Sequence, residues 1–232
     1  MATFDPTIDA AALAARIDHT LLRPDATEAD VRRVAAEARA HGFAGVCVAA
    51  TWVSAVASVV RGTAVKVVSV AGFPLGASPR SVKALEAKEA VRLGADEVDA
   101  VIHLGYARSG LWDAVLQDLH GVVEAADGRP VKAILETSLL GSEEIRRAAE
   151  VAERAGAAFV KTSTGFGPGG ATVEVVRLLR AAVGNRLRVK ASGGVRTLDQ
   201  ALALLAAGAD RLGTSSGVAI VEEARSRQRS QP

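Results

Sequence analysis

Apolar and polar positions follow two alternating patterns along the chain. Alanine-rich stretches repeat apolar residues every three or four positions, as amphipathic helices do. Each is followed by a short run rich in β-branched residues, which is typical of a buried strand. At four junctions a glycine separates the two, namely Gly42, Gly94, Gly156 and Gly208. Because glycine readily adopts the left-handed conformation that ends a helix, these residues predict helix–strand boundaries.

The expected helix starts agree with these boundaries. Thr27 begins T-E-A-D and Thr197 begins T-L-D-Q, the second of which is a capping-box pattern. Ser78 is followed by a proline and Ser142 by two glutamates, and both patterns favour the first turn of a helix. The helices and strands can therefore be placed before any chemistry is considered.

Eight strands are predicted, each followed by a helical segment. Their ranges are 17–20, 45–49, 65–70, 97–102, 131–136, 158–162, 187–191 and 210–214. Such alternation predicts right-handed βαβ units and a parallel sheet. The count of eight favours an α/β fold of the closed (β/α)8 TIM-barrel type over an open doubly wound sheet. No linker divides residues 1–232, so we expect a single barrel domain with a frayed polar tail at 225–232.

Composition narrows the functional classes. The 232 residues include 28 basic and 26 acidic side chains, giving a formal net charge of +2, and only 3% are aromatic. This disfavours a nucleic-acid-binding protein, which needs a basic surface and often stacking aromatics. The single cysteine, Cys47, allows no intramolecular disulfide and fits a reducing compartment. Without a signal-peptide pattern or a membrane-length apolar run, we expect a cytoplasmic protein with no membrane partner.

The lysines are the first candidates for chemistry. Of the basic residues 22 are Arg and only six are Lys, and four of these lie in apolar strand contexts. Lys66 and Lys132 fall at strand beginnings, the structural end of a barrel, whereas Lys161 and Lys190 fall at strand ends, where barrel active sites form. A lysine can lose its proton and attack a carbonyl, which an arginine cannot do. Each lysine could instead pair with a buried acid, but two at neighbouring strand ends favour a catalytic pair, without indicating which member attacks.

Glycine- and serine-rich loops follow the last three predicted strands. Backbone N–H groups and hydroxyls in such loops bind anions, and barrels often bind phosphate after their seventh and eighth strands. The loops therefore predict a phosphate site, and its candidate residues are Gly165, Gly167, Gly169, Gly170, Gly193, Gly194, Gly213, Thr214, Ser215, Ser216 and Gly217.

Acidic residues supply possible partners for the lysines. The strand at 97–102 places Asp99 on a face expected to point into the barrel, as a counter-ion or a proton shuttle. Asp18 and Thr20 share a face of the first strand and could reach the same cavity, while His19 would point outward in a structural role. His103 is a weaker candidate on the Asp99 face. No spacing of histidines or carboxylates suggests a metal site.

These motifs resemble those of one enzyme family. I-D-H-T-L-L at 17–22, G-F-P-L-G at 72–76, G-A-D-E-V-D at 94–99, K-A-I-L-E-T at 132–137, V-K-T-S-T-G-F-G-P-G-G at 160–170, V-K-A-S-G-G-V-R-T at 189–197 and G-T-S-S-G at 213–217 are similar to motifs of the deoxyribose-phosphate aldolases, class I aldolases built on a (β/α)8 barrel. The resemblance covers nearly the whole chain. It implies reversible cleavage of 2-deoxy-D-ribose 5-phosphate to D-glyceraldehyde 3-phosphate and acetaldehyde, in deoxynucleoside catabolism. It also implies no cofactor and a homodimer or homotetramer.

The resemblance also implies roles for individual residues. Lys161 would form the Schiff base, Lys190 would lower its pKa and join in proton transfer, and Asp99 would act with Lys190 through a water. The matching substrate positions are Asp18, Thr20 and Thr164 near the hydroxyls, and Gly165, Gly193, Gly194, Ser215 and Ser216 around the phosphate.

Two departures from the family pattern qualify these roles. Some members have a lysine after K-T-S-T-G, where this chain has Phe166, and some end in a tyrosine that is missing here. The remaining alternatives are another phosphosugar aldolase or isomerase, or a non-catalytic phosphosugar-binding regulator on the same barrel.

Overall fold

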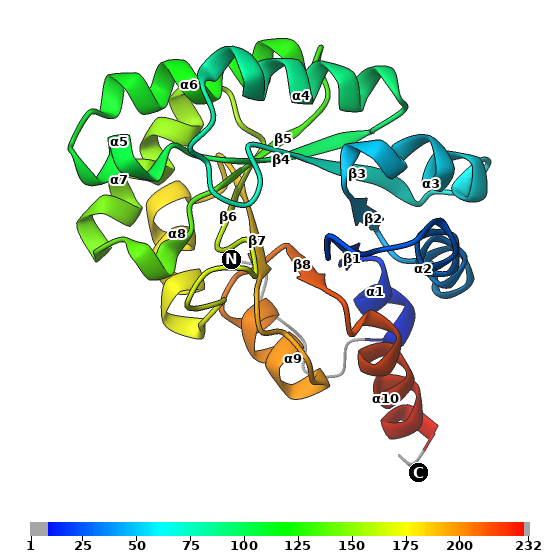
Figure 1. Cartoon of the computed structure of the whole chain (residues 1–232). Helices are drawn as coiled ribbons and strands as arrows, with labels where there is room; N and C mark the ends of the chain where they lie inside the picture. The colour runs from blue at the N-terminus through cyan, green and yellow to red at the C-terminus, as the bar shows by residue number, and fades with distance from the viewer. Residues whose placement is uncertain (1–8, 230–232) are drawn as a thin grey trace.

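The computed structural model describes residues 9–229, and within them the strands form one closed parallel barrel in sequential order (Figure 1). The predicted (β/α)8 fold is confirmed. The strands are β1 (Ile17–Leu21), β2 (Gly45–Val48), β3 (Lys66–Ala71), β4 (Glu97–Val101), β5 (Val131–Ile134), β6 (Phe159–Lys161), β7 (Arg188–Ser192) and β8 (Arg211–Thr214).

Helices surround the barrel and connect successive strands (Figure 1). They are α1 (Ala10–Ala14), α2 (Glu28–His41), α3 (Val53–Val60), α4 (Arg80–Arg92), α5 (Leu104–Arg108), α6 (Trp112–Ala125), α7 (Ser142–Arg154), α8 (Val173–Val183), α9 (Leu198–Ala206) and α10 (Gly217–Arg229). Single 3-10 turns, η1 (Ala50–Trp52) and η2 (Thr137–Leu139), follow β2 and the end of β5. Alanine and valine from the outer faces of the strands pack against the helices in a continuous buried core.

Local signals explain most of the boundaries. The glycines at 42, 94, 156 and 208 all have positive φ and end their helices as predicted. Thr27 and Thr197 form capping boxes, with Asp30 and Gln200 respectively. The tail expected to fray differs in part, because residues 225–229 continue α10, where Arg225 pairs with Glu222 and Arg227 with Asp199. Residues 230–232 lie outside the described part of the chain.

The strand register brings the polar residues together inside the barrel. Asp99 on β4 pairs with Lys132 on β5, and Lys161 on β6 pairs with Lys190 on β7. Asp18 on β1 is level with Gly213 on β8, which closes the ring. Register partners on adjacent parallel strands point to the same side of the sheet, and the contacts among Asp99, Lys132, Lys161 and Lys190 show that this side is the barrel interior.

Candidate active site

Two lysines share one carboxylate oxygen at the centre of the barrel. Asp99 Oδ2 lies 2.7 Å from Lys161 Nζ and 2.8 Å from Lys190 Nζ. The three side chains come from β4, β6 and β7, and all are buried. The structure therefore brings together the predicted lysine pair and its predicted acidic partner.

The same cluster also includes side chains from β1, β8 and β5. Lys190 Nζ also lies 2.5 Å from Asp18 Oδ2, and Asp18 Oδ1 accepts a hydrogen bond from Arg211 at 2.6 Å. On the other side, Lys132 Nζ lies 2.7 Å from Asp99 Oδ1 and 2.6 Å from Glu97 Oε2. Our assignment of Lys132 to the opposite, structural end of the barrel misses this contact, because the register of β4 and β5 places Lys132 directly beside Asp99.

The charges of this cluster do not cancel when every group is ionised. Its four basic groups, Lys132, Lys161, Lys190 and Arg211, face three carboxylates, those of Asp18, Glu97 and Asp99. One positive charge is therefore in excess in a nearly solvent-free interior. An unbalanced charge is unfavourable there, so the cluster favours the loss of one proton from a lysine.

The contacts of Lys161 and Lys190 indicate which of these two lysines loses a proton more easily. Burial lowers the pKa of Lys161 below its usual value, Asp99 opposes this, and the charge of Lys190 adds to the lowering. Burial also acts against the charged form of Lys190, but Asp18 and then Asp99 outweigh it and raise the pKa of Lys190. Lys161 is therefore the amine that becomes neutral first, a distinction that the sequence alone did not provide.

Two carboxylates of the cluster, those of Asp99 and Asp18, stay ionised. Burial acts to raise the pKa of Asp99, but Lys132, Lys161 and Lys190 together hold it well below its usual value. Burial likewise acts against ionised Asp18, and Lys190 is the main group that keeps the pKa of Asp18 low. Both groups are therefore acceptors and counter-ions in the resting site.

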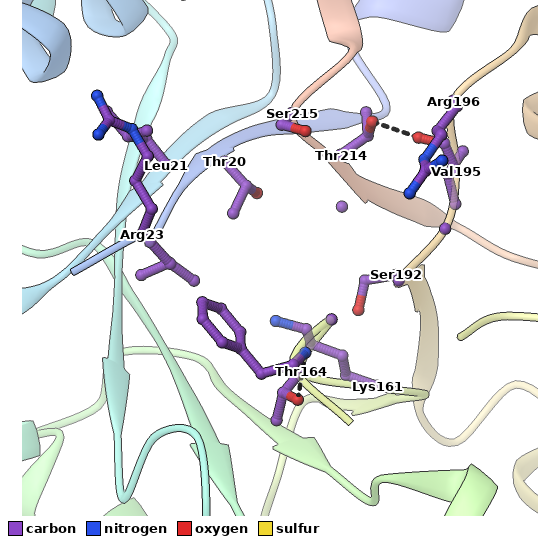
Figure 2. Close-up of a pocket in the computed structure, with 16 residues that line it drawn as sticks. Thr20, Leu21, Arg23, Lys161, Thr164, Ser192, Val195, Arg196, Thr214 and Ser215 are labelled. Carbon is purple, nitrogen blue, oxygen red and sulfur yellow. Dashed lines mark hydrogen bonds between the residues drawn. The ribbon is translucent and has the colours of Figure 1, made fainter. Parts of the chain in front are cut away.

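A cavity of about 340 Å³ opens above the cluster at the C-terminal ends of the strands (Figure 2). Of the three clustered lysines, Lys161 is the one that lines it. The other predicted residues that line it are Thr20, Thr164, Gly165, Gly193, Gly194 and Ser215. Asp18, Asp99 and Lys190 lie beneath this layer, in the buried cluster, and Ser216 lies one residue past Ser215 at the start of α10.

Several lining residues were not predicted. They are Leu21, Leu22, Arg23, Ser192, Val195 and Arg196. Gly213 and Thr214, from the predicted glycine- and serine-rich loop, and Phe166, expected near the phosphate, also line the cavity. Arg196 lies two residues after Gly194, so its position beside the predicted anion loop was a sequence signal for a cation at this site. Arg23 is different, because its guanidinium points away from the cavity (Figure 2) and pairs with Asp25 and Asp30.

Close backbone contact shapes the glycine-rich wall. A Cβ atom at Gly170 would lie 2.2 Å from the carbonyl oxygen of Gly193, so no larger residue fits there. Thr214 ties the next loop in place, since its hydroxyl donates to Val195 O at 2.6 Å and accepts from Ser216 N at 2.9 Å. The wall is thus a preformed surface of backbone groups and hydroxyls next to Arg196, which suits an anion.

The histidines lie away from this cavity. His19 Nε2 contacts Glu37 on α2 at 2.8 Å, in agreement with its predicted outward, structural position. His103 caps α5 and stacks on Tyr106 with ring centroids 3.7 Å apart, so it does not continue the inward face of Asp99. Within residues 9–229, no group of three or more His, Cys, Asp or Glu residues could hold a metal ion, and no helix is long and apolar enough to cross a membrane.

Known proteins are similar to this chain in sequence and in fold. Residues 12–223 match the model of a family described as DeoC/LacD family aldolase. A deoxyribose-phosphate aldolase of Streptococcus sanguinis is 52% identical over 206 residues, covering 89% of this chain and 94% of its own length. One from Clostridium novyi is 52% identical over 211 residues, covering 90% of this chain and 95% of its own length.

Solved structures of similar proteins have the same fold. A deoxyribose phosphate aldolase from Aeropyrum pernix, described as a tetramer, superposes with a TM-score of 0.88 at 38% identity and covers 94% of this chain and 93% of its own. A putative deoxyribose-phosphate aldolase from Coccidioides immitis gives a TM-score of 0.92 at 41% identity, covering 95% of this chain and 88% of its own.

Proposed function

The chain belongs to the DeoC/LacD family of aldolases, and we propose that it cleaves 2-deoxy-D-ribose 5-phosphate reversibly to D-glyceraldehyde 3-phosphate and acetaldehyde. It is a lyase that acts on a small phosphorylated sugar. One observation carries the proposal most directly: a lysine with a lowered pKa, Lys161, lines a cavity whose opposite wall suits an anion. An amine for the carbonyl and an anion site for the phosphate are the two things this substrate requires.

Lys161 is the proposed nucleophile. Its neutral amine attacks C1 of the open-chain sugar, and loss of water leaves a protonated iminium at Nζ. Because Asp99 Oδ2 lies 2.7 Å from Nζ, its charge stabilises the positive iminium in an interior that contains little water. The iminium then accepts the electron pair of the C2–C3 bond when that bond breaks.

Proton transfer completes the cleavage. The C3 hydroxyl loses its proton as the C2–C3 bond breaks, which releases glyceraldehyde 3-phosphate and leaves an enamine on Lys161. C2 of the enamine then takes up a proton, and water hydrolyses the resulting iminium to free acetaldehyde. We assign these transfers to Asp99 and Lys190 acting through water, because Lys190 bridges Asp99 and Asp18 and so connects two acceptors.

The cavity accommodates the rest of the substrate between its two walls. The 5-phosphate is proposed to bind Gly165, Gly193, Gly194, Ser215 and Ser216, with Arg196 as the cation. The sugar hydroxyls are proposed to contact Thr20, Thr164 and, through Lys190, Asp18. This orientation puts C1 at Lys161 and the phosphate at the loops that follow β7 and β8.

Trapping of the iminium tests the proposal. Incubation with acetaldehyde and borohydride is expected to leave an N-ethyl group on Lys161, detected by peptide mass spectrometry. Acetaldehyde release from the 5-phosphate is expected in the parent and not in Lys161→Arg, which keeps the charge but cannot form the iminium. Label found only on Lys190, or full activity in Lys161→Arg, would contradict the mechanism. An isomerase would convert the sugar phosphate without releasing acetaldehyde, and a binding regulator would show neither label nor turnover.

We further propose a single-domain, cytoplasmic protein that assembles as a homodimer or homotetramer. Support for assembly comes from exposed apolar side chains, including Leu75, Val82 and Leu85, and from the tetramer described for the Aeropyrum pernix relative. The single buried cysteine supports a reducing location. Light scattering on the purified protein would distinguish the two assemblies from a monomer.

A further inference from the structure

Glu136 has an unusual backbone conformation beside the active site. It follows β5 and adopts left-handed dihedral angles, φ 50° and ψ 59°. Among residues 9–229, Asp127 is the other non-glycine residue with a positive φ. Aspartate tolerates this region because its short side chain can form a hydrogen bond to the nearby backbone. The longer side chain of glutamate lacks this stabilisation. A conformation of this kind persists where neighbouring contacts enforce it, and such positions cluster at functional sites.

The Glu136 carboxylate is enclosed by the loop that follows Lys161. Its side chain is buried, with 2% of the residue exposed. Oε2 accepts a hydrogen bond from Thr164 N at 3.2 Å and another from the Thr164 hydroxyl, while Oε1 has no hydrogen-bond partner in the described residues. A Cβ atom at Gly167 would lie 2.9 to 3.1 Å from the carboxyl group, so the backbone of this loop runs directly over it.

These contacts fix the direction of the Thr164 hydroxyl. The Thr164 hydroxyl donates its single proton to Glu136 Oε2, so this proton points to Glu136. The hydroxyl oxygen in turn accepts from Phe166 N at 3.0 Å, which orients the next turn of the loop (Figure 2). One lone pair of Thr164 Oγ1 is left, and Thr164 lines the cavity. Thr164 can therefore accept a hydrogen bond from a substrate hydroxyl but has no proton to donate.

We propose that Glu136 is a positioning residue that holds Thr164 and Gly165 in place for the sugar phosphate. Glu136 does not line the cavity and acts through Thr164. The inference rests on the proposed function, because the cavity wall formed by Thr164 and Gly165 is assigned there to the hydroxyls and the phosphate. Lys161 is held separately by Asp99, so iminium formation itself does not need Glu136.

Substitutions of Glu136 distinguish a role in positioning Thr164 and Gly165 from a role in stability alone. Glu136→Leu removes both acceptor oxygens, and Glu136→Gln keeps one acceptor and serves as the conservative rescue. Glu143→Leu is the matched control, because the Glu143 side chain is 88% exposed on α7 and pairs only with Arg146 in the described structure. KM and kcat are measured with 2-deoxyribose 5-phosphate and with unphosphorylated 2-deoxyribose, together with acetaldehyde trapping on Lys161.

The proposal predicts a specific split between these measurements. In Glu136→Leu, KM for the 5-phosphate rises about tenfold or more, as expected when the two hydrogen bonds that position Thr164 are lost. Trapping of acetaldehyde on Lys161 stays within about twofold of the parent, since Lys161 has its own partner. Glu136→Gln lies close to the parent. A purely structural role would lower Tm and leave KM unchanged, and that result in folded Glu136→Leu would overturn the proposal.

Binding of inorganic phosphate distinguishes failure of this proposal from failure of the proposed function. Calorimetry with phosphate needs no turnover, and its dissociation constant is expected to rise about tenfold in Glu136→Leu. If the parent released no acetaldehyde, the proposed function would fail, and the phosphate comparison would still decide the role of Glu136. Should Glu136→Leu not fold, Glu136→Asp carries the same test, because it withdraws the carboxylate by one methylene. Unchanged KM and phosphate affinity in Glu136→Asp would overturn the proposal.

Discussion

Lys132 Nζ lies 2.7 Å from Asp99 Oδ1, and neither side chain is exposed to solvent. This contact leaves Asp99 Oδ2 for Lys161 and Lys190, so the two oxygens of one carboxylate have different partners. Lys132 also adds the positive charge that puts the buried cluster out of balance. Through this charge, without contacting Lys161, it favours the neutral form of the Lys161 amine.

Replacing Lys132 by methionine tests this effect on charge. In Lys132→Met, three cations face three carboxylates, so Lys161 is held more firmly in its protonated form and its pKa rises. The neutral amine is the nucleophile, so activity increases as pH rises through the pKa of Lys161. We therefore expect the acid limb of the kcat profile to move to higher pH by about one unit, equivalent to about 1.4 kcal/mol. The exposed Lys88→Met is the control, and a profile identical to the parent in Lys132→Met would contradict the charge argument.

Sequence patterns predicted the barrel better than the cluster at its centre. Glycines that end helices and Thr caps act within a few residues, so Gly42 and Thr27 could be recognised from neighbouring residues. The contact between Lys132 and Asp99 depends on the pairing of β4 with β5 and on the register in which the two strands pair. Neither is a local property, so Lys132 was misplaced although both strands were predicted.

The same reasoning applies to the division of labour between the lysines. Lys161 and Lys190 have similar sequence surroundings, each at a strand end before a glycine-rich loop. What separates them is Asp18, which contacts Lys190 from the far end of the sequence, 172 residues away. Only closure of the barrel brings β1 beside β8, and a linear pattern does not reveal that contact.

Gly213 provides a test of how tightly the Lys190 side chain is enclosed. A Cβ atom there would lie 3.1 Å from Lys190 Cε and 2.9 Å from Ser192 Cβ. Gly213→Ala should therefore displace Lys190 and lower the free energy of unfolding by about 1–3 kcal/mol, with a parallel loss of kcat. Gly141→Ala is the control, because its nearest neighbouring atom would be 3.5 Å away and its φ is −74°. Urea unfolding and steady-state assays measure both effects, and a Gly213→Ala variant as active and stable as Gly141→Ala would refute the packing argument.

Arg196 is expected to bind the phosphate group. It lines the cavity and its side chain has no hydrogen bond or ion pair among the contacts of the described residues. Arg196→Gln should raise KM for the 5-phosphate about tenfold or more, the loss expected for a charge-assisted hydrogen bond, and should weaken the dependence of KM on salt. KM for unphosphorylated 2-deoxyribose should stay the same. Arg92→Gln, an exposed residue on α4 paired with Glu89, controls for net charge, and equal changes in KM for both sugars would exclude this role.

Phe166 is an apolar residue in the part of the cavity that is proposed to bind the phosphate. The ring lines the cavity, is 54% exposed, and meets Phe73 edge to face with centroids 5.3 Å apart. Because half the side chain is in solvent, replacing it costs little packing, and a lysine there can reach an anion in the cavity. Phe166→Lys should lower KM for the 5-phosphate about threefold to tenfold, an effect that shrinks as salt is raised, since exposed charges are screened.

The control separates charge from the loss of the aromatic contact. Phe166→Met keeps an apolar side chain of similar length and should leave KM for the 5-phosphate near the parent value. Neither variant should alter KM for unphosphorylated 2-deoxyribose, because that sugar has no anion for the wall to bind. A lower KM for both sugars in Phe166→Lys, or the same decrease in Phe166→Met, would show that the ring acts by occupying space at the entrance. The phosphate would then be bound without any electrostatic contribution from this position.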